Sequence, residues 1–394
     1  MKKMLITMLL ITILLTSSLF SYGTDELNNA ETTKTVKSLS LEEAIEEGIK
    51  NSTQLEISDL EIDVKKMELT QARQTEREYD KLSTFLDTIG SSQLEREYRE
   101  AGVPIGTVEG FQLEANMLSK SAKFALEEEE LKKEYLKEDI KYNVMAAYYG
   151  ALQATDYVNV TKRSLENIQK SKDIIDKKFD LGLTSKSDVL MADIALNEAE
   201  INMEKAKEDM QKALRALNMV LNYPLDTELK LTSGFERGAF AADPDEDIKN
   251  AYETRFDMIQ IQHGYELAKL DFETNAYRYT PNTYKYRYKE SSLLKIKNML
   301  EISKQNVEFD IRNKYDSITS AYRQIKLAEA NVEKAGEGLR ITEQLYDVGL
   351  ATVQDVKETI VHLYGAELAL SGAISGYNLA VLEYNKSVRL GIVR

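Results

Sequence analysis

A duplicated motif joined to a heptad pattern is the strongest limit on how this chain can fold. The stretch FDLGLTSKSDVL begins at Phe179 and recurs as YDVGLATVQDVK from Tyr346. After each copy, apolar or small residues follow at spacings of three and four, in one register. This spacing predicts long helices with left-handed, coiled-coil-like packing. The positions are Val189, Ala192, Leu196, Ala199, Met203, Ala206, Met210, Leu214, Leu217 and Leu221, and then Val356, Thr359, Leu363, Ala366, Leu370, Ala373, Tyr377, Val381, Tyr384 and Val388.

Proline positions divide the chain into helical tracts. Proline costs about 3 kcal/mol inside a helix, so it marks where helices cannot run. Two long proline-free tracts remain, both rich in strong helix formers, and each holds one copy of the motif. We therefore predict two homologous halves. The four prolines are Pro104, Pro224, Pro244 and Pro281.

Each half is expected to contain a short amphipathic helix and then a much longer one. Ser40 followed by Glu43 forms a capping box that predicts the start of the first helix. The combined length of the short helix and the helix after the motif roughly equals the length of the long helix between them. This predicts a rod-like hairpin with the motif at its tip. The predicted short and long helices are 41–79 and 113–180 in the first half, and 246–275 and 291–347 in the second.

Residues of the motif predict how the chain turns at each tip. Gly182 and Gly349 fit the left-handed position that follows a helix. Ser185 or Thr184, and in the second copy Thr352, suit the cap of the next helix. A rod this thin has little interior of its own, so its apolar seams predict symmetric oligomerisation.

The first residues predict export. Lys2 and Lys3 precede the apolar run MLITMLLITILL, and small residues follow up to Gly23. This order is typical of a cleaved signal peptide, expected over 1–23 and followed by a linker over 24–39. The alternative is an uncleaved anchor, although the apolar run is barely long enough to span a bilayer.

Composition argues against several functions. The formal charge of −15 argues against a nucleic-acid partner, which would need clustered Lys and Arg. With no cysteine, thiolate metal sites and cysteine nucleophiles are excluded. His263 and His362 lie far apart, and a lone histidine on a long helix is usually a surface residue. The run EEEE over 127–130 reads as a solvated helix face rather than a metal site. We expect no enzyme activity, no metal and no cofactor.

The motif residues resemble a known family. An aromatic residue, then Gly, then Asp-Val-Leu, is similar to the hairpin-tip signature of the TolC family of outer-membrane efflux proteins. The block over 40–69 is similar to the N-terminal block of that family, with Ala44, Asn51 and Leu55 in matching places. Both halves match, so the resemblance covers nearly the whole mature chain. The matching tip residues are Phe179, Gly182, Asp188, Val189 and Leu190.

The resemblance implies a homotrimer whose six hairpins close an α-helical tunnel across the periplasm. It implies that the tips meet a periplasmic adaptor (membrane fusion) protein that works with an inner-membrane pump. The contacting residues would be Gly182, Leu183, Gly349 and Leu350. The expected fold class is therefore mainly α: two homologous halves of long helical hairpins that form a trimeric α-barrel.

The same resemblance places a carboxylate gate near the second tip. Asp355 matches the position of a gate aspartate and Glu358 occupies the second acidic position, so a trimer would carry about six such carboxylates. Ala351 stands where some members have a basic residue, which leaves a latch of that kind in question. The alternative for Asp188 and Asp355 is an acid in the first turn of a helix, favoured by the helix dipole.

The expected membrane strands are reduced or absent. The first insertion, over 81–111, reads more easily as helix and loop. The second, over 276–290, alternates tyrosine with basic residues, a strand signal around a turn, but its arms are too short to span a bilayer. This stretch reads as a plain cap on the helices, a hairpin at a membrane interface, or a basic contact for lipid or wall polymer. Its tyrosines are Tyr277, Tyr279, Tyr284, Tyr286 and Tyr288.

Two functions remain open. The first is the outer component of a tripartite efflux or type I secretion assembly, in the outer membrane with a periplasmic tunnel if the organism has two membranes. The second is a non-conducting envelope scaffold or adaptor-binding protein that has lost its membrane barrel. The predicted repeats span 40–225 and 246–394, with a linker over 226–245.

Overall fold

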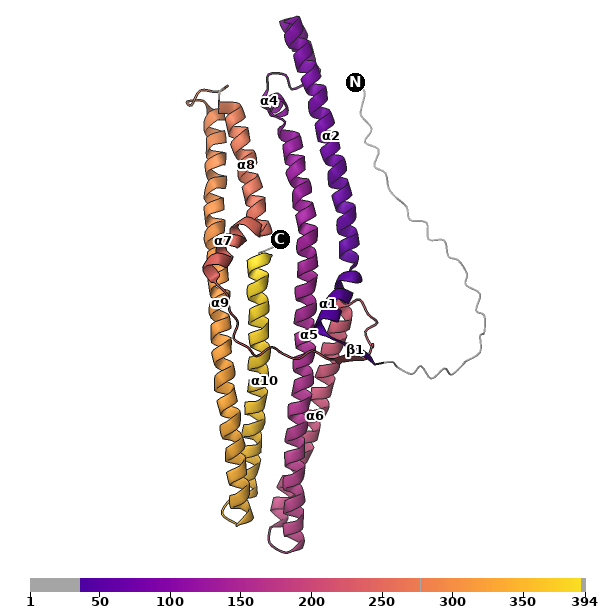
Figure 1. Ribbon diagram of the computed structural model, residues 1–394, viewed down its shortest axis with the longest axis vertical. Coiled ribbons are helices and arrows are strands. Elements are labelled where there is room, and N and C mark those ends of the chain that lie inside the picture. The colour runs from indigo at the N-terminus through magenta and orange to yellow at the C-terminus, as the bar shows by residue number, and fades with distance from the viewer. Residues whose placement is uncertain (1–35, 277, 391–394) are drawn as a thin grey trace, which may run out of the picture. The chain divides into compact units, whose positions relative to one another are not determined.

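The computed structural model describes residues 36–276 and 278–390, which form one compact unit. The predicted signal peptide over 1–23 lies outside the described residues. Helices dominate the unit, and two short strands accompany them (Figure 1). In chain order the elements are β1 Lys37–Leu39, α1 Leu41–Lys50, α2 Thr53–Ile89, α3 Ser92–Glu100, α4 Val108–Glu114, α5 Met117–Asp180, α6 Lys186–Val220, β2 Leu229–Leu231, α7 Pro244–Thr254, α8 Phe256–Ala276, α9 Tyr284–Asp347 and α10 Val353–Arg389.

Two long helices form the axis of the two halves. Helices α5 and α9 have 64 residues each, about 96 Å at 1.5 Å per residue. They end at Asp180 and Asp347, as predicted. On α5 lie α2 and α6, and on α9 lie α7, α8 and α10 (Figure 1). The prediction of a mainly α fold made of two helical hairpins of one plan is confirmed.

The predicted short helices are each broken once. The first breaks between α1 and α2, where the Asn51 side chain donates to the Leu221 carbonyl (3.1 Å) and the Asn222 side chain donates to the Asn51 carbonyl (2.7 Å). The second breaks at Arg255, whose backbone is extended. Its guanidinium is 2% exposed and pairs with Asp257 at 2.8 Å. In each half a side-chain amide satisfies a backbone carbonyl near the break, since Asn222 donates to Asn51 and Gln262 donates to the Tyr252 carbonyl (3.0 Å).

The heptad seam lies inside the unit. All ten predicted positions after each motif copy are buried or half-buried. They contribute to two main apolar clusters, one in each half. Tyr148 and Leu217 belong to the first cluster, and Ile325 and Tyr377 to the second. The predicted register is therefore confirmed.

The two halves are joined by a strap over 221–243, which crosses from α6 to α7. Within it β2 pairs in parallel with β1, and Lys37 lies opposite Leu229. Strands of three residues are too short to show a sequence pattern, so this pairing was not predicted. Tyr148 fixes the strap: its hydroxyl donates to the Leu39 carbonyl (3.1 Å) and accepts from the Ser233 N–H (3.0 Å). The side chain of Phe235 packs against both clusters.

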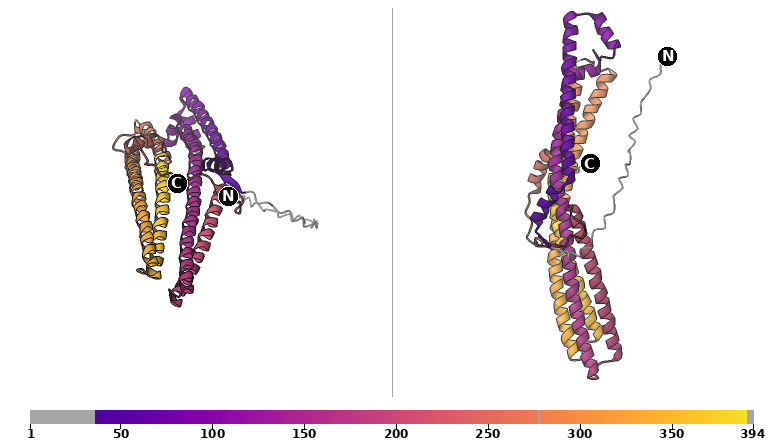
Figure 2. Two further views of the ribbon diagram at one scale, coloured as in Figure 1. Left: turned by 60° about the horizontal axis from the view of Figure 1, so that its bottom comes forward. Right: turned by 90° about the vertical axis from the view of Figure 1, so that its right-hand side faces the viewer.

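The halves also touch directly, because α5 packs against α10 and α8. The order across the unit is therefore α2 and α6, then α5, then α10 and α8, then α9 (Figures 1 and 2). Helices α2 and α9 lie at its two edges. Both tips lie at the same end of the unit (Figure 1).

The tyrosine stretch corrects a prediction. Its alternation predicted a strand hairpin, but α9 begins at Tyr284, so Tyr284, Tyr286 and Tyr288 are helical. Tyr279 lies in the turn before it, and Tyr277 is outside the described residues. The first insertion, over 81–111, forms the end of α2, then α3 and the start of α4, as its charge pattern favoured. In the described part of the chain, every helix is too short or too polar to cross a membrane.

Candidate functional site

The backbone at both tips follows one design. At the first tip Gly182 has φ 74°, its N–H bonds to the Phe179 carbonyl (2.8 Å), and the Leu183 N–H bonds to the Lys178 carbonyl (2.8 Å). At the second tip Gly349 has φ 79°, and the Leu350 N–H bonds to the carbonyl five residues earlier (2.8 Å). This pair of bonds is the Schellman motif, and its left-handed position favours glycine. The turn predicted at each tip is confirmed.

The helices that leave the tips begin with identical capping boxes. The Ser185 hydroxyl accepts from the Asp188 N–H (3.2 Å), and the Asp188 carboxylate accepts from the Ser185 N–H (3.0 Å). Thr352 and Asp355 exchange the same bonds, at 3.2 Å and 2.8 Å. Such reciprocal bonds satisfy donors that the first turn of a helix leaves free. Both tips are therefore short, hydrogen-bonded turns rather than open loops.

The same bonds explain the charge of the two aspartates. The hydroxyl and N–H of Ser185 hold the pKa of Asp188 below its usual range. The N–H and hydroxyl of Thr352 do the same for the pKa of Asp355. Because a carboxylate accepts hydrogen bonds better than its protonated form, these bonds favour the ionised state. Both tips thus carry a fixed negative charge.

The two tips pack on one another. Ile175, Val189 and Ala192 of the first hairpin form a small buried cluster with Val353 of the second. Above it, the Lys178 ammonium lies 3.7 Å from the centre of the Tyr346 ring and donates to the Tyr346 carbonyl (3.0 Å). The halves therefore present their tips as one joined surface.

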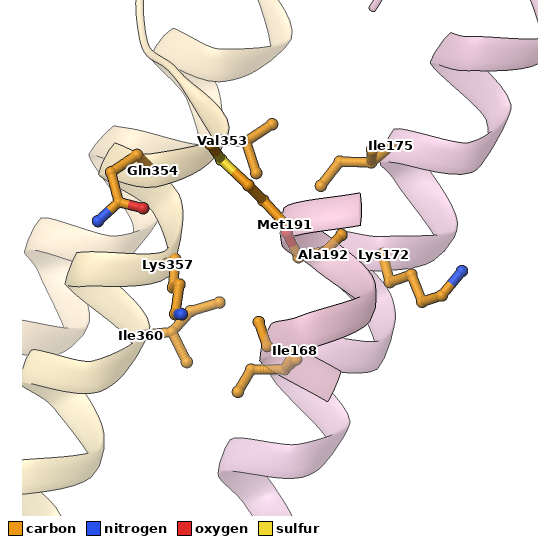
Figure 3. Close-up of a pocket in the computed structure, with 11 residues that line it drawn as sticks. Ile168, Lys172, Ile175, Met191, Ala192, Val353, Gln354, Lys357 and Ile360 are labelled. Carbon is orange, nitrogen blue, oxygen red and sulfur yellow. The ribbon is translucent and has the colours of Figure 1, made fainter. Parts of the chain in front are cut away.

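A mostly apolar groove lies behind the joined tips, between α5, α6 and α10. In Figure 3 the side chains of Ile168, Ile175 and Ile360 lie around it. Lys172, at its edge, pairs with Asp176 (2.6 Å) and Asp193 (3.1 Å), so its charge is already compensated. The groove therefore has the character of a joint between helices rather than of a site for a charged ligand.

Four large apolar side chains project from the tips into solvent. They flank the two glycines in equivalent pairs and are 69–77% exposed. Sequence reasoning singled out Leu183 and Leu350 but missed the residues before each glycine, although their apolar character in both copies was a visible signal. Exposed apolar residues grouped in this way are typical of a protein-binding surface. The four are Leu181, Leu183, Val348 and Leu350.

The predicted gate residues lie on the first turns of α10. Asp355 is exposed and bound within its capping box, which favours the alternative role in the helix start. The Glu358 side chain is also exposed and accepts from the Gln354 amide (2.9 Å). The two acids are one helical turn apart on one helix, and their gate role stays a prediction.

The histidines differ in their surroundings. His362 is exposed, but His263 is half-buried, which corrects the expectation of a surface residue. Its ring stacks on Phe124 at 4.0 Å, and its Nδ1 lies 2.8 Å from a Glu128 carboxylate oxygen. Neither histidine belongs to a cluster of metal ligands, because the described residues contain no group of three such side chains.

Comparison with known proteins gives this geometry a context. Residues 110–222, which hold the first hairpin and its tip, match the model of the outer membrane efflux protein family. No curated protein matches this chain in sequence.

Solved structures of similar fold cover most of the chain. A membrane protein from Pseudomonas aeruginosa is 13% identical with a TM-score of 0.66, over 89% of this chain and 90% of its own. The transmembrane channel protein CusC is 13% identical with a TM-score of 0.64, over 89% and 92%. The outer membrane protein VceC from Vibrio cholerae is 16% identical with a TM-score of 0.63, over 88% and 95%. The expected resemblance to TolC-like proteins is confirmed by the family match over 110–222, and the chain shares the fold of these solved structures.

Proposed function

We propose that this protein is the outer component of a tripartite efflux or type I secretion assembly. The chain matches the outer membrane efflux protein family over residues 110–222 and shares the fold of outer-membrane channels. The observation that carries this proposal is the pair of hairpins whose exposed apolar tips lie side by side at one end of the unit. Such tips suit docking of helical partner proteins. In this function the protein is exported and resides in the outer membrane, with a tunnel in the periplasm.

Apolar stripes on the two edges of the unit support a homotrimer. On α2, at one edge, Ile57, Leu60, Val64 and Met67 are 46–68% exposed at helical spacing. On α9, at the other edge, Ile302, Phe309 and Leu327 are 55–71% exposed. A single chain leaves both stripes in water. When α2 of one chain meets α9 of the next, head-to-tail contacts of this kind close a ring.

The tips would bind the adaptor. Leu183 and Leu350 are 72% and 77% exposed, although a leucine after the glycine of a Schellman motif often packs back on its own helix. Their exposure leaves apolar area for a partner to bury. The adaptor in turn connects the tunnel to an inner-membrane pump, which selects the cargo.

A carboxylate ring at the tips would favour cations. In a trimer, Asp355 and Glu358 of three chains supply about six acids, and such rings attract cations and repel anions. Asp355 would act both as the cap of α10 and as a charge in this ring, because its capping bonds keep it ionised.

One observation favours the alternative, a non-conducting scaffold. The two insertion segments, over 81–111 and 276–290, contain helices and turns at the positions where the family resemblance implies membrane strands. A scaffold would keep the tips and the trimer but carry no ions.

Single-channel current across a planar lipid bilayer tests the proposal, after the mature protein is shown to be a trimer. We expect stepwise openings that prefer cations, and a loss of this preference in the Asp355→Asn, Glu358→Gln double variant. Val361→Ala, which removes an exposed apolar side chain about one turn further along α10, is the control and should keep the preference. A well-formed trimer that never conducts would contradict the conduit and support the scaffold.

A further inference from the structure

Helix α9 begins at the end of the unit opposite the tips (Figure 1). Its first turns carry a patch of exposed tyrosine and basic side chains. Tyr284 and Tyr288 are 82% and 59% exposed, and their rings lie 6.3 Å apart. Spacings of three, four and eleven place Arg287, Tyr288 and Lys295 on the same helix face as Tyr284. We name this surface the basic tyrosine patch, which comprises Tyr284, Lys285, Arg287, Tyr288 and Lys295.

The charge of the patch is opposite to that of the chain. Between 278 and 297 there are six basic residues and one acidic residue, in a chain of net charge −15. Two of the six are compensated, because Arg278 pairs with Glu114 (2.9 Å) and Lys289 with Asp271 (2.6 Å). The other four form no ion pair with any described residue, and all are exposed. These four are Lys285, Arg287, Lys295 and Lys297.

The patch rests on an ordered base. Tyr286, between the exposed tyrosines, points the other way and packs edge-on against Phe272, with ring centres 5.3 Å apart. The Asp271 carboxylate accepts from Gln112 (2.7 Å) and pairs with Lys289. This network ties α4, α8 and α9 together. The exposed rings are therefore held in place by the fold and are not a loose tail.

We propose that the basic tyrosine patch binds the headgroup region of an anionic lipid membrane. Tyrosine is enriched at membrane–water interfaces because its ring is apolar and its hydroxyl polar. Lysine and arginine near an anionic surface each contribute attraction that falls off within the Debye length. An acidic polymer would use the cations but would give the paired phenol rings no apolar layer to enter. The inference rests on the proposed function in one respect: that function decides which membrane this end of the protein meets.

The absence of tryptophan from the chain allows a direct test. Tyr284→Trp introduces a single fluorescent probe in the patch. With vesicles that contain anionic phosphatidylglycerol, we expect a blue shift and quenching by brominated lipid, and neither with phosphatidylcholine alone. Ile201→Trp is the control: it is 68% exposed on α6, the helix that begins at the first tip, and should show neither change.

Charge variants test the electrostatic part. Lys285→Gln with Arg287→Gln should weaken vesicle binding by about fivefold for each charge removed, since one basic residue is worth about 1 kcal/mol at such a surface. The matched control is Lys162→Gln with Lys170→Gln, two exposed lysines on α5, which should leave binding unchanged.

Three results would overturn the inference: no shift at Tyr284→Trp, an equal shift with uncharged lipid, or an equal shift with soluble heparin, which would assign the patch to an acidic polymer. The test does not depend on conduction. If the protein binds vesicles but carries no current, the proposed conduit is wrong and the lipid-binding patch stands. If it conducts but Tyr284→Trp shows no blue shift, only the lipid-binding patch is wrong.

Discussion

Two different roles can explain why an aspartate stands at position 355. The family resemblance gave it a gate role, and elementary helix chemistry gave it a place in the first turn of α10. In the structure its carboxylate accepts from the N–H and hydroxyl of Thr352, so the helix start accounts for its contacts. Asp188 repeats this arrangement with Ser185. Because the duplicated tip needs two caps, the repetition of aspartate follows from local structure alone.

The two caps predict acid-sensitive tips. Since hydrogen bonds lower the folded-state pKa of Asp188 and Asp355, their contribution is complete above the pKa of the unfolded chain, near 3.9, and is lost as the pH falls through the lower folded value. We expect amide protection in the first turns of α6 and α10 to decrease below about pH 4, measured by hydrogen exchange. In the Asp188→Asn, Asp355→Asn variant the protection should no longer vary in this pH range. Protection that falls equally in both proteins would contradict the assignment.

Tyr148 is predicted to stabilise the strap through its hydroxyl. Tyr148→Phe leaves the Ser233 N–H and the Leu39 carbonyl without this partner in a buried place, so we expect a loss of about 1–3 kcal/mol in the free energy of unfolding, measured by urea denaturation. Tyr142→Phe is the control, because the Tyr142 hydroxyl forms no hydrogen bond with the described residues. A similar loss in both variants would show that the hydroxyl bonds of Tyr148 are not the cause.

At the scale of elements, long helices were predictable and short irregularities were not. The ends at Asp180 and Asp347 follow from Gly182 and Gly349, which carry a local signal. The break at Arg255 has none, because it depends on Asp310 and Ser387, which are distant in sequence. The tyrosine stretch was mispredicted because two patterns compete within it. Its alternation has the period of a strand, but the Thr283 cap and the contact of Tyr286 with Phe272 favour a helix.

Helix α1 approaches α5 so closely at Gly48 that adding one methyl group there is predicted to lower the stability of the protein. A Cβ added at Gly48 would lie 2.5 Å from a methyl carbon of Val144, which is fully buried. We expect Gly48→Ala to destabilise the protein by about 1–3 kcal/mol through overpacking, despite the better helix propensity of alanine. Thermal and urea unfolding measure the change.

Two further variants complete this test. Gly264→Ala, where no atom beyond the neighbouring residues and the adjacent backbone of its own helix lies within 4 Å of the added carbon, should instead stabilise its helix by about 0.5–1 kcal/mol. Val144→Ala combined with Gly48→Ala should recover part of the loss, because it removes the opposing methyl groups. If Gly48→Ala behaved like Gly264→Ala, α1 would not be packed closely on α5.

At the scale of the molecule, the repeat predicted the architecture. Motif, heptad register and proline positions were enough for two hairpins, their turns and the inward-facing seam. The way the halves join could not be predicted, since the strap depends on three paired residues and on single contacts such as Phe235. Of the tip site, the glycines and leucines were predictable, whereas the contact of Lys178 with Tyr346 joins positions that no pattern relates.

The proposed trimer predicts that one charge on the edge stripe prevents assembly. Leu60 on α2 is 68% exposed, so Leu60→Glu should leave the single chain folded while placing a charge in an apolar contact. We expect monomers by light scattering, with an unchanged circular dichroism spectrum. Leu225→Glu is the control, because Leu225 is 55% exposed in the loop after α6 and does not lie on α2, and it should remain trimeric. A trimer that tolerates Leu60→Glu would exclude this face from the contact.

The strap has a mechanical consequence. It is fastened to both hairpins near mid-length: Ser233 bonds to Tyr148 of the first, and the backbone of Glu236 exchanges two bonds with the Asn378 side chain of the second. The contact between the tips is smaller, a few apolar side chains and Lys178 on Tyr346. Between the strap and the tips the hairpins also touch, where Thr161 bonds to Tyr364 and Arg163 to Glu367. A partner that pulls the tips apart would therefore break the tip contact first and meet more contacts as the separation moves toward the strap.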